Sequence, residues 1–289
     1  MFLKTTPFKW MGGKSTLASK ILDHLPEEKI YVEPFCGSAA LLFHKDPSPV
    51  EVLNDLDSHI VNLFRVLQDK DLYKQLEEKI QWTLYSREEF ITALNILKAE
   101  NLGPIEKAWA FYVTQNQGFG GVKPTIGRWG RAFIPSGDRA MTASQWGNRQ
   151  QLFGEWHKRL MRVQIDHIDA LECIKYWDSP ETVFYIDPPY IESTRKSEKY
   201  LHDTEDDFHT NLYTILLNLQ GKAVLSGYND NMTYQPLLEN GWSLMELDTV
   251  CRVAAQTRTS GLKGKGKLLE NQRRTECLWI KGTKKNLFN

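Results

Sequence analysis

The residues best suited to chemistry are Asp187-Pro188-Pro189-Tyr190, which directly follow an apolar run at 183–186. The two prolines fix the backbone and remove two hydrogen-bond donors, so the Asp187 carboxylate and the Pro188 carbonyl remain as rigid acceptors. Two acceptors suit an exocyclic amino group on a planar base, because holding both hydrogens favours a nitrogen with an available lone pair. The flat face of Tyr190 would stack on that base. The competing interpretation, a proline-stiffened turn with a buried tyrosine, is disfavoured by the strand-like run before the motif.

A second group of chemically suggestive residues lies in the stretch FKWMGGKSTL, which begins at Phe8. Its Gly-Lys-Ser looks like the end of a phosphate-binding P-loop. That motif requires a buried strand ahead of it and a glycine five residues before Gly13, where this chain has Phe8. Both requirements fail, which disfavours nucleoside triphosphate hydrolysis. The same stretch suits a cofactor, because the face of Trp10 favours a cation, Lys14 pairs with a carboxylate, and Gly12 lets the backbone come close.

Acidic residues stand at the ends of three predicted strands, where parallel sheets bind their ligands. Glu33 ends the first strand, Asp55 follows the second, and Asp187 follows the third. Asp55 lies 22 residues after Glu33, near the ~20-residue spacing at which an acid holds ribose hydroxyls. The first turn has one clear glycine, Gly37, instead of the three of a pyrophosphate loop. A nucleoside without phosphates, such as S-adenosylmethionine, therefore fits better, although Glu33 and Asp55 as plain polar strand ends are an equal alternative.

Predicted strands and helices alternate along the chain, which indicates an α/β fold of the nucleotide-binding type. A mostly helical stretch interrupts the alternation, so we expect one α/β domain made of residues 1–56 and 161–289, with an insert at 57–160. The predicted strands are residues 30–33, 50–53, 163–165, 183–186, 223–226, 242–247 and 277–280. The predicted helices are one beginning at Ala39, a tract around 60–67, a helix capped by Ser86, and residues 105–114, 145–160 and 207–219.

The segment 115–139 breaks the helical pattern with six glycines, two prolines and three interleaved aromatic residues. Loops of this length in compact domains are usually functional, and we expect a long loop or a β-hairpin. The segment has four Lys and Arg against one Asp, and residues 252–289 have ten against two Glu, in a chain of zero net charge. Such local basic faces suit a polyanion held in one groove, although any single charge run is more often a solvated loop.

Bulk composition narrows the classes of protein to consider. The chain has 289 residues, of which 41% are hydrophobic and 25% charged, as in ordinary soluble globular proteins. A run of ~18 apolar residues and the apolar core of a secretory signal are both missing, so we expect no membrane segment and a cytoplasmic location. The four cysteines lie far apart without a Cys-x-x-Cys, which disfavours a zinc site and a disulfide framework.

Together, three motifs resemble the Dam-type DNA adenine-N6 methyltransferases of bacteria and their phages. They are Phe8-Lys-Trp-Met-Gly-Gly-Lys14, Val32-Glu-Pro-Phe-Cys-Gly37 and Asp187-Pro-Pro-Tyr190, in the family's order and over nearly the whole chain. The resemblance implies a Rossmann-like methyltransferase domain with an inserted target-recognition domain that carries a β-hairpin. It also implies S-adenosylmethionine as methyl donor without a metal, double-stranded DNA as partner and, in some members, a cognate restriction enzyme.

The resemblance further implies roles for individual residues. Asp187 and Tyr190, with Pro188 and Pro189 between them, would hold an adenine flipped out of the duplex. Lys9 matches a position that reaches DNA. The expected cofactor-binding residues are Trp10, Gly12, Lys14, Glu33, Phe35, Gly37, Ser38, Asp55 and Asp187. The expected DNA-binding residues are Lys9, Asn116, Gln117, Lys123, Arg128 and Arg131.

Three alternatives stay open. Methylation of cytosine N4 is disfavoured because the family associates Ser-Pro-Pro with it, whereas this chain has Asp187. Methylation of RNA or of a protein side-chain amide is weakly disfavoured by the basic loop and by the lack of an RNA-binding appendage. A DNA-binding relative without activity is disfavoured by the intact catalytic motif. The recognised DNA sequence is not predicted, since family hairpins carry Arg-x-x-x-Arg and this chain has Arg128-Trp-Gly-Arg131.

Overall fold

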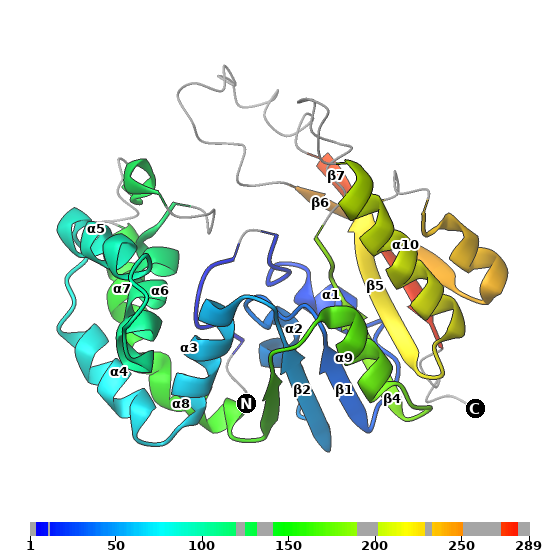
Figure 1. Ribbon diagram of the computed structural model, residues 1–289, viewed down its shortest axis with the longest axis horizontal. Helices are drawn as coiled ribbons and strands as arrows, with labels where there is room; N and C mark the ends of the chain where they lie inside the picture. Colours follow the sequence, from blue (N-terminus) through cyan, green and yellow to red (C-terminus); the bar gives the residue numbers. More distant parts are fainter. Residues whose placement is uncertain are drawn as a thin grey trace. The chain divides into compact units, whose positions relative to one another are not determined.

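The computed structural model describes residues 4–10, 12–119, 125–131, 141–189, 202–228, 233–250 and 273–282 (Figure 1). Within these residues, seven strands form one sheet in the order β3-β2-β1-β4-β5-β7-β6. The strands are β1 (Ile30–Glu33), β2 (Val50–Asn54), β3 (Val163–Asp166), β4 (Thr182–Ile186), β5 (Lys222–Tyr228), β6 (Ser243–Val250) and β7 (Arg273–Lys281). The predicted mixed α/β fold is confirmed, and each predicted strand is present.

Parallel pairing dominates one part of the sheet. The pairs β2–β3, β1–β4 and β4–β5 are parallel, whereas β7 is antiparallel to both β5 and β6. All five residues of β4 are buried, as is typical of a central parallel strand covered on both faces. Because parallel strands share the edge at which they end, the residues that follow β1 and β4 lie at the same edge of the sheet.

The helices follow the order that the sequence predicts, with three additions, at Ala18–Leu22, Leu72–Gln81 and Ala170–Trp177, and with a 3₁₀ helix dividing the predicted helix at 145–160. Ser86 caps α5 as predicted, since its hydroxyl accepts a hydrogen bond from the Glu89 amide at 3.1 Å. The helices are α1 (Ala18–Leu22), α2 (Ala40–His44), α3 (Ser58–Gln68), α4 (Leu72–Gln81), α5 (Arg87–Ile96), α6 (Pro104–Gln117), α7 (Met141–Arg149), α8 (Phe153–Leu160), α9 (Ala170–Trp177) and α10 (His202–Asn218). Short 3₁₀ helices are η1 (Ile126–Arg128), η2 (Gln150–Leu152) and η4 (Gln235–Asn240).

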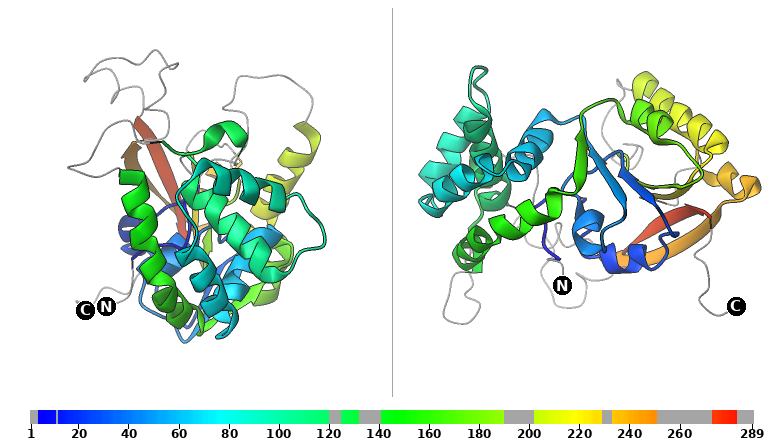
Figure 2. Two further views of the ribbon diagram at one scale, coloured as in Figure 1. Left: turned by 90° about the vertical axis from the view of Figure 1, so that its left-hand side faces the viewer. Right: turned by 90° about the horizontal axis from the view of Figure 1, so that it is seen from below.

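The chain divides into two compact units. The first consists of Met1–Ala18 and Cys36–Ile168, and the second consists of Ser19–Phe35 and Asp169–Asn289. The first unit thus contains β2, β3 and the helices α3 to α8 between them, and the second contains β1 and β4 to β7. In the second unit, α9 and α10 lie side by side along the sheet (Figure 2). The division into a sheet domain and an insert at 57–160 stays a prediction.

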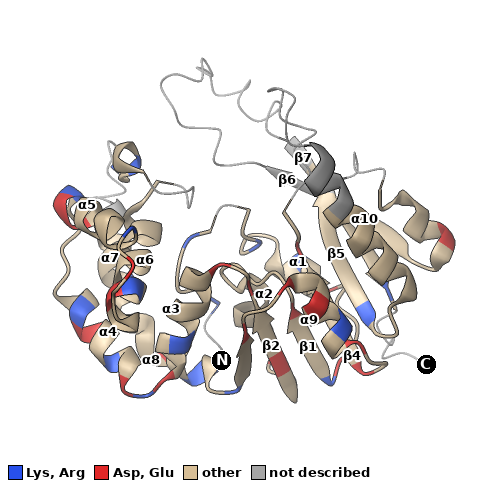
Figure 3. Ribbon diagram, viewed as in Figure 1, with Lys and Arg blue, Asp and Glu red and all other residues tan. Residues whose placement is uncertain are grey.

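A buried charge cluster joins β2 to α8 within the first unit. β2 carries an acidic residue within the strand (Figure 3). This residue, Glu51, is fully buried. Its carboxylate accepts hydrogen bonds from Arg159 at 2.5 and 2.8 Å and from Lys45 Nζ at 3.0 Å. The Ser48 amide also donates to it, at 3.1 Å. Since all three charged side chains are buried, this cluster holds the strand and the helix together only while its charges stay paired.

None of the helices in the described part of the chain is both long enough and apolar enough to cross a membrane.

Candidate active site

In the first unit, Asp55 directly follows β2 and holds the glycine turn at residues 36–39. Its carboxylate accepts hydrogen bonds from the Gly37 amide at 2.8 Å and from the Asp57 amide at 2.9 Å. Burial raises the pKa of Asp55, and these two amide hydrogen bonds oppose the rise. A carboxylate offers about four acceptor sites. The two amides and the Cys36 thiol, which donates at 3.9 Å, use three of them, so Asp55 can still accept from a ligand hydroxyl group.

The stretch around Trp10 packs directly on this turn. A methyl group added to Gly37 would lie 3.0 Å from two atoms of the Trp10 indole, and Gly37 has a φ of +48°. Both the close approach and the left-handed backbone therefore require glycine. A methyl group on Gly13 would lie 3.0 Å from the Trp10 carbonyl and 3.4 Å from the Ser38 hydroxyl. The structure thus brings together two motifs that the sequence places more than 20 residues apart.

Lys14 lies in the same stretch and is only 5% exposed. Its ammonium donates a hydrogen bond to the Gly12 carbonyl at 3.2 Å, and Gly12 has a φ of +81°. Burying an ammonium is unfavourable unless polar or anionic groups surround it. An anionic ligand group brought to Lys14 would therefore gain more here than at the protein surface.

In the second unit, two acids occupy the ends of neighbouring parallel strands. Glu33 ends β1 and Asp187 follows β4, and the register pairs Val32 with Phe184. Glu33 is 1% exposed and accepts a hydrogen bond from the Tyr31 hydroxyl at 2.9 Å. Asp187 is half-buried. The sheet therefore places a buried and a half-buried carboxylate at the same edge, as the sequence predicts.

The residues around Asp187 form a rigid and largely buried setting. Pro188 is buried and Pro189 is exposed, while Tyr190 lies outside the described residues. Burial, followed by the negative charge of Asp187, raises the pKa of Tyr185 well above its ordinary value. Phe35, also expected at this site, is half-buried and meets the Phe208 ring edge-on at 6.1 Å.

Two buried polar residues of the second unit were missed by the sequence analysis. The Ser226 hydroxyl of β5 donates a hydrogen bond to the Glu276 carboxylate of β7 at 2.6 Å. The register of β4 and β5 pairs Ile186 with Leu225, so Ser226 lies one residue beyond this pair on β5, as Asp187 does after β4. The charge of Glu276 also acts on Tyr185. The sequence signal that could have pointed to them is weak: Ser226 ends one predicted strand, and Glu276 lies one residue before another.

The segment of residues 118–119 and 125–131, named the recognition loop after the DNA contacts predicted for its arginines, folds back on itself in the first unit. Gly118 and Trp129 form an antiparallel bridge, and the Phe119 amide donates to the Arg128 carbonyl at 2.8 Å. Arg128 and Arg131 are exposed. These features agree with the expected turn-back of the chain, although the segment containing Lys123 lies outside the described residues.

Asn116 and Gln117 occupy a different environment from the one expected for base-reading residues. Asn116 is 3% exposed and Gln117 is fully buried, both in the last turn of α6. The Asn116 amide donates to the Pro7 carbonyl at 3.1 Å, and the Gln117 amide donates to the Leu84 carbonyl at 2.8 Å. These side chains are buried against backbone, which does not favour the expected contact with DNA, and that contact stays a prediction.

Lys9 directly precedes Trp10 and contacts the last turn of α6. Its ammonium donates to the Asn116 carbonyl oxygen at 3.2 Å. Burial, followed by the positive charge of Arg149, lowers the pKa of Lys9 to about 8. The Arg149 guanidinium itself donates to the backbone carbonyls of Thr6 and Pro7 at 2.9 and 3.3 Å. Two cations thus converge on the stretch that precedes Trp10.

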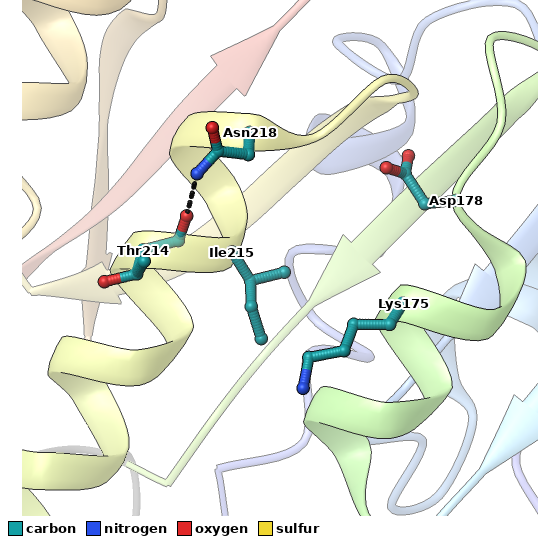
Figure 4. Close-up of a pocket in the computed structure, with 5 residues that line it drawn as sticks. All are labelled: Lys175, Asp178, Thr214, Ile215 and Asn218. Carbon is teal, nitrogen blue, oxygen red and sulfur yellow. Dashed lines mark hydrogen bonds between the residues drawn. The ribbon is translucent and has the colours of Figure 1, made fainter.

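A hollow of about 280 Å³ lies elsewhere in the second unit, between α9 and α10 (Figure 4). The Asp178 carboxylate on its rim accepts from the backbone amides of Gln220 and Gly221. Asp178 comes before β4 and Asp187 after it, so the hollow lies at the opposite edge of the sheet from the acids. The hollow is lined by Lys175, Asp178, Thr214, Ile215 and Asn218.

Among the residues that the structure describes, no three His, Cys, Asp or Glu side chains are grouped so as to hold a metal ion.

The fold and these residues define a class of protein: an α/β protein with a glycine turn and acidic residues at the carboxyl ends of its parallel strands. Sheets of this kind bind nucleoside cofactors at the carboxyl ends of their strands. The model of the D12 class N6 adenine-specific DNA methyltransferase family matches residues 10–251. The chain belongs to this family.

Individual relatives are distant. A DNA adenine methylase of Vibrio cholerae is 23% identical over 193 residues, which cover 63% of this chain and 64% of that protein. A DNA adenine methylase of Escherichia coli K12 is 23% identical over 232 residues, covering 72% and 70%. The solved structure of precorrin 8W decarboxylase from Methanobacterium thermoautotrophicum covers 93% of this chain and 90% of its own, with 9% identity and a TM-score of 0.35. A likeness this low supports no argument.

Proposed function

We propose that this protein is a site-specific DNA methyltransferase that transfers the methyl group of S-adenosylmethionine to N6 of adenine in double-stranded DNA. The observation that carries the proposal is the acceptor pair Asp187–Pro188 directly after the buried strand β4, in a member of an N6 adenine-specific family. The carboxylate at this position favours adenine over cytosine, for which the family pattern has serine.

The residues of the first unit suit S-adenosylmethionine in three respects. Asp55 has acceptor capacity for a ribose hydroxyl, the buried ammonium of Lys14 suits a ligand carboxylate, and the face of Trp10 suits a cationic group. The tight contact of Trp10 with the glycine turn would fix that face in place. We assign cofactor binding to Trp10, Gly12, Lys14, Gly37, Ser38 and Asp55 of the first unit and to Glu33, Phe35 and Asp187 of the second.

Gly37→Ala should weaken S-adenosylmethionine binding about tenfold in calorimetry. The added methyl group lies 3.0 Å from the Trp10 indole at a φ of +48°, so the turn or the indole must move, and such backbone strain costs about 1–3 kcal/mol. Gly154→Ala in α8 is the matched control, because nothing lies within 4 Å of its added methyl group. If Gly37→Ala binds S-adenosylmethionine with wild-type affinity, the proposed role of Trp10 in cofactor binding is wrong.

On the substrate side, the target amine is inaccessible in a stacked duplex, so the adenine must be flipped out. We assign the flipped base to Asp187 and Pro188, whose oxygens accept its two amino hydrogens, and to Tyr190, which would stack on its ring. Bound S-adenosylmethionine supplies an electrophilic methyl group on its sulfonium. The Asp187 carboxylate stabilises the positive charge that develops on the amino nitrogen, and the surplus proton leaves afterwards. Pro189 keeps the turn rigid, which helps to position the amine.

On the DNA side, we propose contacts from Lys9, Lys123, Arg128 and Arg131. Arg128 and Arg131 are exposed on the recognition loop, whose base is closed by backbone hydrogen bonds. An arginine on such a loop suits a guanine edge or a phosphate. Asn116 and Gln117 are left out of this set because they are buried.

DNA affinity should fall as the pH rises through about 8, because Lys9 attracts a phosphate only when protonated and its pKa is lowered to about 8. The folded pKa lies below the ordinary 10.5, so the folded state binds fewer protons between these values. Lys9 therefore reduces stability most below pH 8, and this loss disappears as the pH rises from about 8 to 10.5. Fluorescence anisotropy with a cognate duplex from pH 7 to 9.5 measures the affinity, and Lys9→Arg should remove the dependence. A wild-type affinity that is flat in this range contradicts the role of Lys9.

The remaining features of the proposal concern architecture and setting. The helices α3 to α8 between β2 and β3 support a target-recognition domain at 57–160, within a Rossmann-like methyltransferase domain formed by residues 1–56 and 161–289. We propose that the protein acts in the cytoplasm of a bacterium or a phage-infected bacterium. A cognate restriction enzyme is a candidate partner.

Transfer of tritium from labelled S-adenosylmethionine to unmethylated duplex DNA tests the activity directly. Nucleoside analysis of the product should place the label in N6-methyladenine. Label in N4-methylcytosine or in RNA would replace the proposed substrate with another one. Incorporation into none of these nucleic acids, by protein that is folded and binds the cofactor, would end the enzyme hypothesis.

A further inference from the structure

The last turn of α6 contacts both the recognition loop and the N-terminal strip, defined as residues 5–10. We propose that Asn116 and Gln117 are positioning residues that act as one bracket, which fixes the recognition loop and the N-terminal strip relative to each other. Through the strip the bracket helps to place Trp10 for the cofactor, and through the loop it helps to place the arginines for DNA. This role rests on the proposed function and deepens it.

Asn116 holds the strip side of the bracket. Its side-chain amide donates to the Pro7 carbonyl at 3.1 Å, and its backbone carbonyl accepts from the Lys9 ammonium at 3.2 Å. Trp10 follows immediately and packs on Gly37. A single buried residue therefore holds the Pro7 backbone and the Lys9 side chain, just before the expected cofactor contact. A buried hydrogen bond of this kind is costly to leave unmade, because water cannot replace the lost partner.

Gln117 holds the loop side. Its backbone carbonyl accepts from the Gly130 amide at 2.8 Å, and its side-chain amide donates to the Leu84 carbonyl at 2.8 Å. Tyr85, which follows Leu84, also binds the loop: its hydroxyl donates to the Gly130 carbonyl at 2.7 Å. A methyl group on Gly130 would lie 3.0 Å from both the Gln117 carbonyl and the Tyr85 hydroxyl, so there is little room for the loop to shift.

Trp129 links the exposed arginines of the loop to Tyr85. Its ring lies 5.5 Å from the Tyr85 ring, and the Arg87 guanidinium lies over it at 5.5 Å. A cation over an indole face is favourable, so Arg87 holds Trp129 in place. Arg128 and Arg131 stand on either side of Trp129 and Gly130 in the chain. The position of both arginines is therefore set by Gln117 and Tyr85.

The two halves of the bracket predict different losses on mutation. Asn116→Ala should raise the Kd for S-adenosylmethionine and the Kd for a cognate duplex, each by about three- to tenfold, the range for one lost hydrogen bond. Tyr85→Phe should raise only the Kd for the cognate duplex and lower the ratio of cognate to non-cognate affinity. If Asn116→Ala does not fold, Asn116→Leu has a similar shape without the amide and serves for the same titrations.

Matched controls exist in the second unit. The Asn218 amide of α10 donates to the Thr214 carbonyl at 2.9 Å (Figure 4), just as Asn116 donates to the Tyr112 carbonyl at 3.1 Å one turn earlier in α6. Asn218→Ala therefore removes the same kind of intrahelical hydrogen bond, but no hydrogen bond to the N-terminal strip. Tyr176→Phe removes a hydroxyl from a tyrosine that is 76% exposed. Both controls should keep wild-type affinities.

The double variant Asn116→Ala/Tyr85→Phe tests whether the two residues act together. A single bracket predicts that its loss of duplex affinity is at least threefold smaller than the product of the two single losses, because coupled groups are non-additive. A loss equal to that product, or an unchanged cofactor Kd in Asn116→Ala, overturns the bracket. Wild-type protein that binds S-adenosylmethionine but no duplex would instead reject the proposed function, and the cofactor titration would still decide the role of Asn116.

Discussion

Asp187→Asn should lower kcat for methyl transfer to duplex DNA about 10²–10³-fold, with much smaller changes in the Kd for duplex and for S-adenosylmethionine. Asparagine keeps the size of the side chain and one acceptor oxygen, so the base can still bind. The negative charge is lost, and that charge matters most when the amino nitrogen becomes positive in the transition state. Removing one preorganised electrostatic partner of a developing charge typically costs a factor of this size.

Single-turnover tritium transfer at saturating cofactor and duplex isolates the chemical step for this comparison. Asp178→Asn is the matched control, because Asp178 is an acid at the other end of β4 whose carboxylate holds the Gln220 and Gly221 amides. It should alter stability and leave single-turnover kcat near wild type. Wild-type kcat in Asp187→Asn, with the asparagine verified by mass spectrometry, would take the catalytic role away from this carboxylate.

The parts of the site that the sequence predicts well are those set by local order. Glu33 and Asp187 each belong to a motif in which an apolar run, an acid and a turn follow one another, so the strand end and the acid are placed together. Parallel pairing then brings both acids to one edge. For Gly37 and Trp10 the sequence predicts only that both belong to the cofactor site. Their close packing depends on a backbone turn with positive φ, which the sequence does not reveal.

The parts that the sequence predicts poorly depend on pairing between distant segments. Ser226 and Glu276 meet because β7 returns antiparallel to β5, and neither residue stands in a recognisable motif. The sequence predicts a helix that ends at residue 114, which places Asn116 and Gln117 in a loop and makes them candidates for DNA contact. In the structure α6 continues to Gln117, so both residues belong to its buried last turn. A polar residue beside a basic loop is thus ambiguous until the end of the helix is known.

The buried cluster of Glu51, Lys45 and Arg159 is equally invisible in the sequence, because Arg159 lies 108 residues from its partner. Glu51→Gln should lower the free energy of unfolding by about 3–5 kcal/mol, as when one partner of a buried ion pair is removed. The reason is that two buried cations then lack a counter-charge while the shape of the side chain is kept. The melting temperature should fall by roughly 5–15 °C, which differential scanning calorimetry and urea unfolding at pH 7 both measure.

The pH dependence and a compensated variant separate this charge effect from a packing defect. Burial alone would raise the pKa of Glu51, but hydrogen bonds and charges from Arg159 and Lys45 outweigh it and hold the pKa below the ordinary 4.5. The stabilisation by Glu51 is therefore complete above pH 4.5 and is lost as the pH falls further, so Glu51→Gln should differ less from wild type in acid. Replacing all three charged residues with methionine should recover much of the loss, because no buried charge is left unpaired. If the triple variant is less stable than Glu51→Gln, the pairing of charges is not what holds β2 to α8.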